Sequence, residues 1–409
     1  MEIHGFYAWR PLPEVAHTLA SVPYDTVDRE EAKALAEGNP RSFLHVIRPE
    51  IDFPDEVDAY DSRVYAEAAA AMERFLADGD LIVDHHPAIY VYRLQMGSHV
   101  QRGIVACCNA EDYRKGLILR HEKTRQDKED DRTRHVRAVG ANTGPVFLTY
   151  RDASVIDRLV GEVEATEPLY SLTAPDGVLH SIWQVHDIVP FIEAFGPVDR
   201  FYIADGHHRA AAAVRAATEL QEIEPGPVAD EASRFLCVLF PATQLKVLGY
   251  HRVVADLHGM TAETFLEKLR KVFVLNVHPH AVEPMVCGQA GMYLAGQWYT
   301  LSWDVPAGDD PVAALDVSVL QDRVLAPILG IDDPRTSDRI SFVGGIRGTV
   351  ALENEVDAGR AAVAFSMCPV SVDAVMSIAE AGREMPPKST WFEPKLRSGL
   401  LIHPFVPEW

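Results

Sequence analysis

The sequence predicts a mixed α/β (α+β) fold, because segments typical of strands alternate along the chain with segments of helical periodicity. Residues 29–37 and 62–76 bring small apolar side chains to one helical face, and a Gly-Asn-Pro run ends the first of these segments. Residues 88–94 and 103–107 are rich in β-branched and aromatic side chains, which is typical of paired strands.

A further strand is expected at residues 235–240, and residues 246–254 begin another unit. With 409 residues, the chain is long enough for two or three domains, each with a sizeable core. Apolar residues make up 47% of the chain and charged residues 24%, which are ordinary values for a globular protein. Disorder is therefore not expected for the chain as a whole.

The net charge is −22, from 60 acidic and 38 basic side chains. Such a surface repels polyanions, and the sequence has no long basic stripe, so we expect no nucleic acid partner. The composition favours a protein that handles small molecules.

The five cysteines are scattered without a Cys-x-x-Cys pair, so neither a disulfide framework nor a zinc ribbon is expected. The N-terminus lacks the basic and then apolar order of a signal peptide. No stretch approaches the roughly 18 uninterrupted apolar residues that a membrane span needs. We therefore expect a cytoplasmic protein without a membrane partner.

The most informative segment is residues 202–209, which four consecutive alanines follow. A short strand is expected to end just before Gly206 and to turn into a helix, because Gly suits a tight turn and Ala is the best helix former. The N–H groups of the helix start, with His207, His208 and Arg209 on the first turn, predict a cradle for phosphate.

Asp205 places a carboxylate beside this positive cluster. It is a candidate catalytic base and metal ligand, since a carboxylate there can take a proton from a hydroxyl or hold a metal ion. The alternative is a helix start whose histidines only cap or pack. We favour the binding site, because three consecutive cation-capable residues suit a helix N-terminus poorly unless they bind an anion.

A second cluster, Arg120-His121-Glu122, directly follows the apolar residues 117–119. A His-Glu pair at a strand end is placed like a catalytic base and its orienting group, so Glu122 is a second candidate base. Arg120 and His121 can reach a phosphate. The charged residues that follow include Asp131, which is either a metal ligand or part of a salt-bridged surface helix.

Two other segments are candidates for ligand contacts. Asn39 and Ser42 can hydrogen-bond a substrate and Arg48 can bind a carboxylate or phosphate, although Asn-Pro is also ordinary turn chemistry.

Residues 385–395 combine prolines, lysines, hydroxyls and aromatic side chains. This composition suits a loop that closes over phosphates through Lys388, Ser389, Thr390 and Lys395. An exposed tail packed by its two aromatic residues has the same composition.

Two motifs are set aside. Asp84-His85-His86 resembles a manganese phosphoesterase motif but lacks partner aspartates after earlier strands, so we expect a loop before a strand at Ala88. Residues 344–348 lack the Lys-Ser/Thr of a Walker motif, and we expect a glycine-rich turn between strands.

Together these segments resemble a family catalogued as a domain of unknown function and associated with free-serine kinases, which shares a core with ParB and sulfiredoxin proteins. The most specific match is the Asp-Gly-His-His-Arg element at residues 205–209, similar to the Gly-x-His-Arg turn with which those domains hold nucleotide phosphates. The other matching segments are residues 23–25, 39–50, 120–122, 131–132, 142–150, 315–320 and 385–403.

The resemblance implies a transfer of a phosphoryl group from ATP or ADP to free L-serine, with Mg²⁺ as cofactor. Residues 206–209 would bind the phosphates, His207 would belong to the catalytic residues, and Asp205 would be a base or magnesium ligand. Such transfers depend on positioning and charge stabilisation, so a cradle of N–H groups, an arginine, Mg²⁺ and one carboxylate is chemically sufficient.

The resemblance also implies a domain division. Residues 1–240 would form a ParB/sulfiredoxin-like catalytic region with N-terminal substrate-binding elements. Residues 241–409 would form a C-terminal α/β region with a ligand loop at residues 385–403.

Two other functions stay open at this point. A ParB-like nucleotide switch would clamp DNA, which the net charge of −22 and the lack of a basic recognition helix disfavour. A phosphohydrolase would use the same cradle with water as the acceptor. Sulfiredoxin-like reduction is not expected, because no cysteine lies beside His207 in the sequence.

Overall fold

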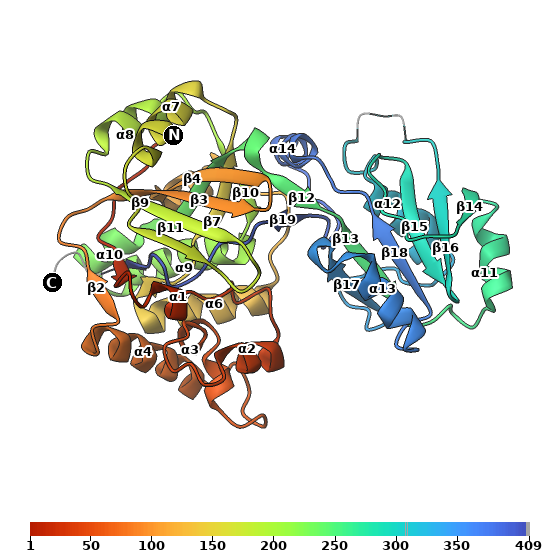
Figure 1. Ribbon diagram of the computed structural model, residues 1–409, viewed down its shortest axis with the longest axis horizontal. Coiled ribbons are helices and arrows are strands. Elements are labelled where there is room, and N and C mark those ends of the chain that lie inside the picture. Colours follow the sequence, from red (N-terminus) through yellow and green to blue (C-terminus); the bar gives the residue numbers. More distant parts are fainter. Residues whose placement is uncertain (307, 309, 406–409) are drawn as a thin grey trace. The chain divides into compact units, whose positions relative to one another are not determined.

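A computed structural model describes residues 1–306, 308 and 310–405 (Figure 1). The chain forms two compact units, Met1–Leu245 with Pro394–Trp409, and Lys246–Glu393. The second unit is thus an insertion in the sequence of the first, and the segment 385–403 is shared between them. The mixed α/β class predicted from the sequence is confirmed.

An eight-stranded sheet forms the centre of the first unit. Its neighbouring strands pair antiparallel, except for the β5–β10 and β7–β11 pairs, which are parallel. In order across the sheet the strands are β5 (Ile118–Leu119), β10 (Phe201–Asp205), β7 (Val146–Tyr150), β11 (Arg234–Pro241), β4 (His99–Asn109), β3 (Ile89–Met96), β9 (Leu179–Val185) and β8 (Tyr170–Thr173).

The predicted strands at residues 88–94, 103–107 and 235–240 lie in β3, β4 and β11, and β3 and β4 pair as expected. The loop predicted at Asp84-His85-His86 is also confirmed. Short two-stranded sheets join β1 (Trp9–Pro11) to β2 (Leu81–Val83) and β6 (Ala141–Asn142) to β20 (His403–Pro404).

The main core of the first unit is built from β-branched and aromatic side chains of the sheet and from the helices packed on it. The alanine-rich α9 brings its small side chains against the sheet, which lets helix and sheet approach closely. The helices that contribute to this core are α5 (Ala110–Arg114), α7 (Ser154–Glu164), α8 (Val189–Phe195) and α9 (His207–Ile223).

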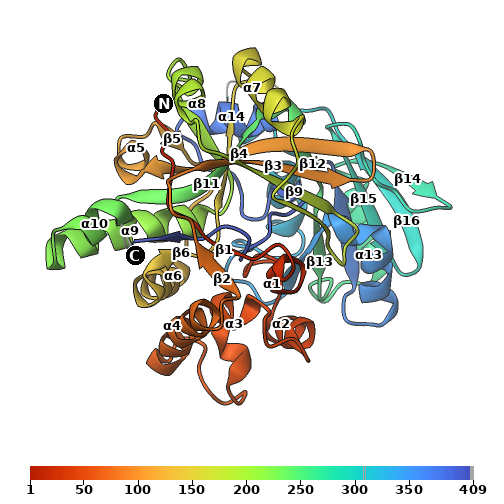
Figure 2. The same ribbon diagram turned by 60° about the vertical axis from the view of Figure 1, so that its left-hand side comes forward.

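Further helices pack on the outer side of α9 (Figure 2). Helix α6 packs on α9, and α4 packs on α6. A second apolar cluster fills the space among the N-terminal helices, and the helices predicted at residues 29–37 and 62–76 are confirmed as α2 and α4. The elements are α1 (Ala16–Leu19), α2 (Arg29–Ala36), α3 (Leu44–Ile47), η1 (Pro49–Asp52), α4 (Ser62–Ala77), α6 (Gln126–Val139), α10 (Pro227–Ala232) and η2 (Ala242–Gln244).

The second unit is built on a six-stranded antiparallel sheet. A separate pair joins β12 (Lys246–Leu248) to β19 (Trp391–Glu393). In order across the larger sheet the strands are β14 (Val274–His278), β16 (Gln297–Ser302), β15 (Gln289–Leu294), β18 (Val363–Met367), β13 (Tyr250–Val254) and β17 (Ile340–Gly344).

Both faces of this sheet are covered, because successive strand residues belong to different apolar clusters. Met292 and Phe365 belong to one cluster, and their neighbours Tyr293 and Ala364 belong to the other. Helices α11 (Ala262–Leu269), α12 (Asp316–Leu320), η3 (Gln321–Leu325) and α14 (Val372–Glu380) contribute to the first cluster, and α13 (Gly348–Asp357) contributes to the second.

The glycine-rich segment 344–348 corrects one prediction. We expected a turn between strands, but β17 leads through η4 (Gly345–Arg347) into helix α13. The Gly344 side of this turn is tight, since a Cβ atom there would lie 2.7 Å from the Trp391 ring. Close packing, and not phosphate binding, accounts for that glycine.

Among the described residues, no helix is long and apolar enough to cross a membrane.

We predict that Phe201→Ala lowers the free energy of unfolding by about 3 to 5 kcal/mol, because it empties a fully buried site in β10 that packs against Phe195. Chemical denaturation measures the loss. Val155→Ala is the control, since Val155 is 50% exposed and its truncation should change stability by less than about 0.5 kcal/mol. A small loss for Phe201→Ala would contradict the described core.

Candidate functional site

The turn between β10 and α9 has the geometry that the sequence predicts. Gly206 adopts φ 90°, a left-handed conformation that suits glycine, and α9 begins at the next residue. A Cβ atom on Gly206 would lie only 2.9 Å from Nε of Arg209. No side chain of the described residues caps the helix, so its first N–H groups are placed to donate hydrogen bonds to an anion.

Asp205 is the centre of a group of charges at this turn. Its Oδ2 lies 2.8 Å from Nζ of Lys395, and its Oδ1 accepts a hydrogen bond of 2.7 Å from the N–H of Gly206. The same Oδ1 lies 3.7 Å from Nη2 of Arg209. Two cations therefore converge on one carboxylate.

These cations control the protonation of Asp205. Burial alone would raise its pKa, but the charges of Lys395 and Arg209 hold the pKa well below its ordinary value of 3.8. Asp205 is consequently ionised throughout the neutral range. A carboxylate in this state holds cations well and is a weak proton acceptor.

Arg209 is held on more than one side. Its Nη2 lies 3.5 Å from Oδ2 of Asp25, and its Nη1 donates to the carbonyl of Pro145. Burial opposes its charge, yet Asp25 and Asp205 raise the pKa of the guanidinium above its ordinary value. The buried Nε has no hydrogen-bond partner among the described residues. Arg209 thus keeps a donor available.

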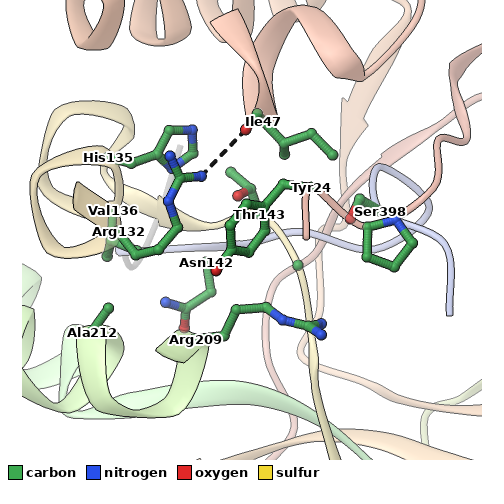
Figure 3. A pocket seen from close by; sticks show the side chains of 12 residues that line it. Tyr24, Ile47, Arg132, His135, Val136, Asn142, Thr143, Arg209, Ala212 and Ser398 are labelled. Atoms are coloured by element: carbon green, nitrogen blue, oxygen red, sulfur yellow. Dashed lines mark hydrogen bonds between the residues drawn. The ribbon is translucent and has the colours of Figure 1, made fainter. Parts of the chain in front are cut away.

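A cavity of about 30 Å³ lies beside Arg209 (Figure 3). Arg132 and Arg209 reach it from α6 and α9, and the guanidinium of Arg132 stacks 4.4 Å from the centre of the Tyr24 ring. Arg132 also donates to the carbonyl of Ile47 at 3.2 Å. The cavity is water-sized in this conformation.

The two histidines that follow the neighbouring strands β5 and β10 lie together. The rings of His121 and His207 meet edge to face with centroids 4.5 Å apart, and Glu122 lies beside them. Burial lowers the pKa of His121 to about 4, and burial followed by the proximity of His121 holds the pKa of His207 far below 6.5. Both rings are neutral near pH 7, so neither supplies the positive charge expected for phosphate binding.

Two other predicted phosphate ligands, His208 and Arg120, make hydrogen bonds to neighbouring residues. His208 accepts a hydrogen bond of 3.1 Å from the N–H of Arg125. Arg120 is exposed and donates to the hydroxyl of Tyr113 at 3.3 Å. Their predicted role stays a prediction.

Asp131 is not on a salt-bridged surface but on the inner side of α6, where it is buried. Its Oδ1 accepts from the hydroxyl of Tyr65 at 2.9 Å, and its Oδ2 lies 2.8 Å from Nε of Arg132. Both oxygens already have donors, so Asp131 serves to orient Arg132 in this arrangement.

The predicted substrate ligands of the N-terminal segment are engaged in local structure. Asn39 donates to the carbonyl of Thr18 at 2.7 Å, and buried Ser42 lies 3.3 Å from the hydroxyl of Ser21. Arg48 pairs with buried Glu50 at 2.8 Å. Their predicted role as substrate ligands stays a prediction.

Lys388, Ser389 and Thr390 belong to the second unit. Lys388 lies 5.6 Å from the centre of the Tyr250 ring, and Ser389 donates to the carbonyl of Pro386 at 2.6 Å. Their predicted role in closing over phosphates stays a prediction.

The contact of Lys395 with Asp205 and the position of Asp25 beside Arg209 were not predicted from the sequence. Asp25 belongs to the Pro-Tyr-Asp segment 23–25, and Lys395 belongs to the loop predicted to close over phosphates. Lys395 is separated from Asp205 by 190 residues, and no local spacing reveals a contact at that range.

Comparison with known families identifies the chain. Residues 3–318 match the family described as "Protein of unknown function (DUF1015)", and the chain belongs to this family. No curated protein matches the sequence.

Several solved structures are similar at low identity. A free serine kinase in complex with AMP is 13% identical with a TM-score of 0.36, and the match covers 70% of this chain and 86% of that one. SbnI from Staphylococcus aureus, with a C-terminal truncation, is 12% identical with a TM-score of 0.39 over 72% and 85% of the two chains. A conserved hypothetical protein from Pyrococcus furiosus is 13% identical with a TM-score of 0.34 over 70% and 90%.

We predict that Lys395→Met destabilises the protein at neutral pH, because it leaves the partly buried Asp205 without its nearest cation. The folded-state pKa of Asp205 is depressed, so the pair's contribution is complete above about pH 5 and declines as the pH falls below 3.8. The difference in unfolding free energy between wild type and variant should therefore shrink in acid.

Lys33→Met is the matched control for this experiment. Lys33 is 58% exposed and lies 3.7 Å from an exposed carboxylate, a kind of pair that contributes little to stability. Denaturation of both variants across the acid range separates the two cases. A loss for Lys395→Met no larger than that for Lys33→Met would contradict the described site.

Proposed function

We propose that this protein is a phosphotransferase that moves a phosphoryl group from ATP or ADP to the hydroxyl of free L-serine. The observation that carries the proposal is the convergence of Arg209 and Lys395 on Asp205 at the uncapped start of α9. Two cations and a set of backbone N–H groups are suited to a chain of phosphates.

The cations would stabilise charge during the transfer. Phosphoryl transfer requires little covalent help from the protein and depends on donors placed where negative charge develops. Arg209 is already oriented by Asp25 and Asp205 and keeps Nε available, so it would need little reorganisation on binding. Lys395 would exchange part of its contact with Asp205 for a phosphate oxygen.

The role of proton acceptor falls to Asp25. Asp205 is held ionised by two cations and is better suited to orient them. The side chain of Asp25 is 32% exposed, lies 3.5 Å from Arg209, and follows Pro23 and Tyr24, which line the cavity. It can therefore reach both a phosphate-binding guanidinium and a substrate hydroxyl. Glu122 is the alternative acceptor.

The predicted Mg²⁺ does not fit at the two carboxylates first considered for it. Both oxygens of Asp205 have donors, from Gly206 and Lys395, and both oxygens of Asp131 have donors as well. Mg²⁺ is usually held by one or two carboxylates together with substrate phosphates and water, and the oxygens of these two carboxylates are already engaged.

The proposal is tested by incubating the protein with L-serine, MgCl₂ and either ATP or ADP, and by following phosphorus NMR. O-phosphoserine is the expected product, and the nucleotide that yields it is the donor. Free phosphate without phosphoserine would replace the proposal by a phosphohydrolase. Binding of nucleotide without turnover would favour a nucleotide-dependent switch.

Arg209→Lys should lower the rate of transfer by about 100-fold or more, because a lysine keeps one charge but loses the forked donors. Arg134→Lys is the control, since Arg134 is exposed on α6. Wild-type turnover in Arg209→Lys would contradict a role of this guanidinium in the transfer.

Asp25→Asn should lower kcat while nucleotide affinity, measured separately by calorimetry, changes little. Glu122→Gln, assayed in parallel, distinguishes the two proposed acceptors. A normal kcat for Asp25→Asn together with a low kcat for Glu122→Gln would reassign the proton acceptor to Glu122.

A further inference from the structure

Three ligand-type side chains meet at one edge of the large sheet. Strands β5 and β10 are parallel, with Ile118 opposite Phe201 and Leu119 opposite Tyr202. The segments that follow the two strands therefore leave the sheet at the same edge. They carry His121 with Glu122 from one strand and His207 from the other.

The ligand atoms of these three residues lie close enough to share one ion. One nitrogen from each imidazole and one oxygen of Glu122 all lie within 4.8 Å of one another. The rings stand edge to face at 89°, so their nitrogens are not blocked by stacking.

Burying the two imidazoles costs free energy unless their nitrogens have a hydrogen-bond partner or a metal ion. His121 is 1% exposed and His207 is 6% exposed. Nε2 of His207 has no hydrogen-bond partner among the described residues, and the ring of His121 has only a contact with the backbone of Ile203 that falls short of good hydrogen-bond geometry. Buried polar atoms are nearly always satisfied, so poorly satisfied imidazole nitrogens gathered at one place point to a missing ligand.

We propose that His121, Glu122 and His207 bind one divalent transition-metal ion of the zinc type. Two histidines and one glutamate form a ligand set found at zinc sites that leave a coordination position open. Imidazole nitrogen suits zinc, cobalt and iron, whereas magnesium prefers oxygen ligands. Apart from Glu122, which is also the alternative proton acceptor, these ligands take no part in the proposed transfer.

A second group of possible metal ligands has to be kept from contributing to the measured metal binding. Cys287, Asp316 and Cys368 of the second unit also bring ligand atoms within 4.8 Å of one another. Asp316 there already accepts a hydrogen bond of 2.8 Å from the N–H of Gly288. All titrations are therefore made in a Cys287→Ser background, which removes the exposed thiol of this cluster.

The experiment uses the full chain, stripped with EDTA and titrated with Co²⁺ in the absence of nucleotide. Visible d–d absorption reports the site, Zn²⁺ competition gives affinity, and mass spectrometry of the metal gives stoichiometry. We expect one equivalent of metal, nitrogen and oxygen coordination without a thiolate charge-transfer band, and a higher melting temperature with Zn²⁺.

His121→Gln and His207→Gln should each weaken Zn²⁺ binding by at least about 100-fold. Mutation of a residue that only hydrogen-bonds to a metal ligand already lowers metal affinity by about 10- to 100-fold. Glu122→Gln should weaken it as well. His86→Gln is the matched control, because His86 is exposed in the loop before β3 and should leave affinity unchanged. Circular dichroism verifies that each variant is folded.

The proposal is overturned if the stripped Cys287→Ser chain takes up no stoichiometric Co²⁺ or Zn²⁺. It is also overturned if, in this background, His121→Gln and Glu122→Gln bind metal as tightly as His86→Gln does. If His207→Gln does not fold, the melting-temperature shift of the Cys287→Ser chain and the titration of Glu122→Gln still decide the question. Since nucleotide is absent, failure here does not bear on phosphoryl transfer.

Discussion

The carboxylate of Asp205 is the constraint on which the site depends. It lies at the end of β10, next to the edge strand β5, and it gathers the ammonium of Lys395, the guanidinium of Arg209 and the N–H of Gly206. Without a shared anion, two partly buried cations would repel each other and pay for desolvation. One ionised carboxylate therefore makes a concentrated positive site possible at the start of α9.

Chain topology supplies the members of that site from distant parts of the sequence. The second unit interrupts the first between β11 and Pro394, and the returning C-terminal segment delivers Lys395 next to β10. The parallel pairing of β5 with β10 likewise brings His121 beside His207. The second juxtaposition follows from strand order, and the first follows from the return of the chain to the first unit at Pro394.

The sequence predicted the structure best where the conformation depends on residues that are neighbours in the chain. The strand, glycine turn and alanine-rich helix around Gly206 could be predicted, because each step rests on the conformational preference of a single residue type. The same reasoning failed for Asp131, which has the charge pattern of a surface helix but is buried against Tyr65 and Arg132. Charge spacing along a helix does not reveal which face packs inward.

The sequence by itself determined the α/β class, the motif at residues 205–209 and the family resemblance, since these are written in contiguous residues. Only the tertiary structure decided that Asp205 is a counterion for Lys395 and Arg209, and that His121 and His207 are neutral and buried together. Protonation and partnership depend on which side chains surround a group in space. Those neighbours come from segments up to 190 residues apart, beyond the range of any local pattern.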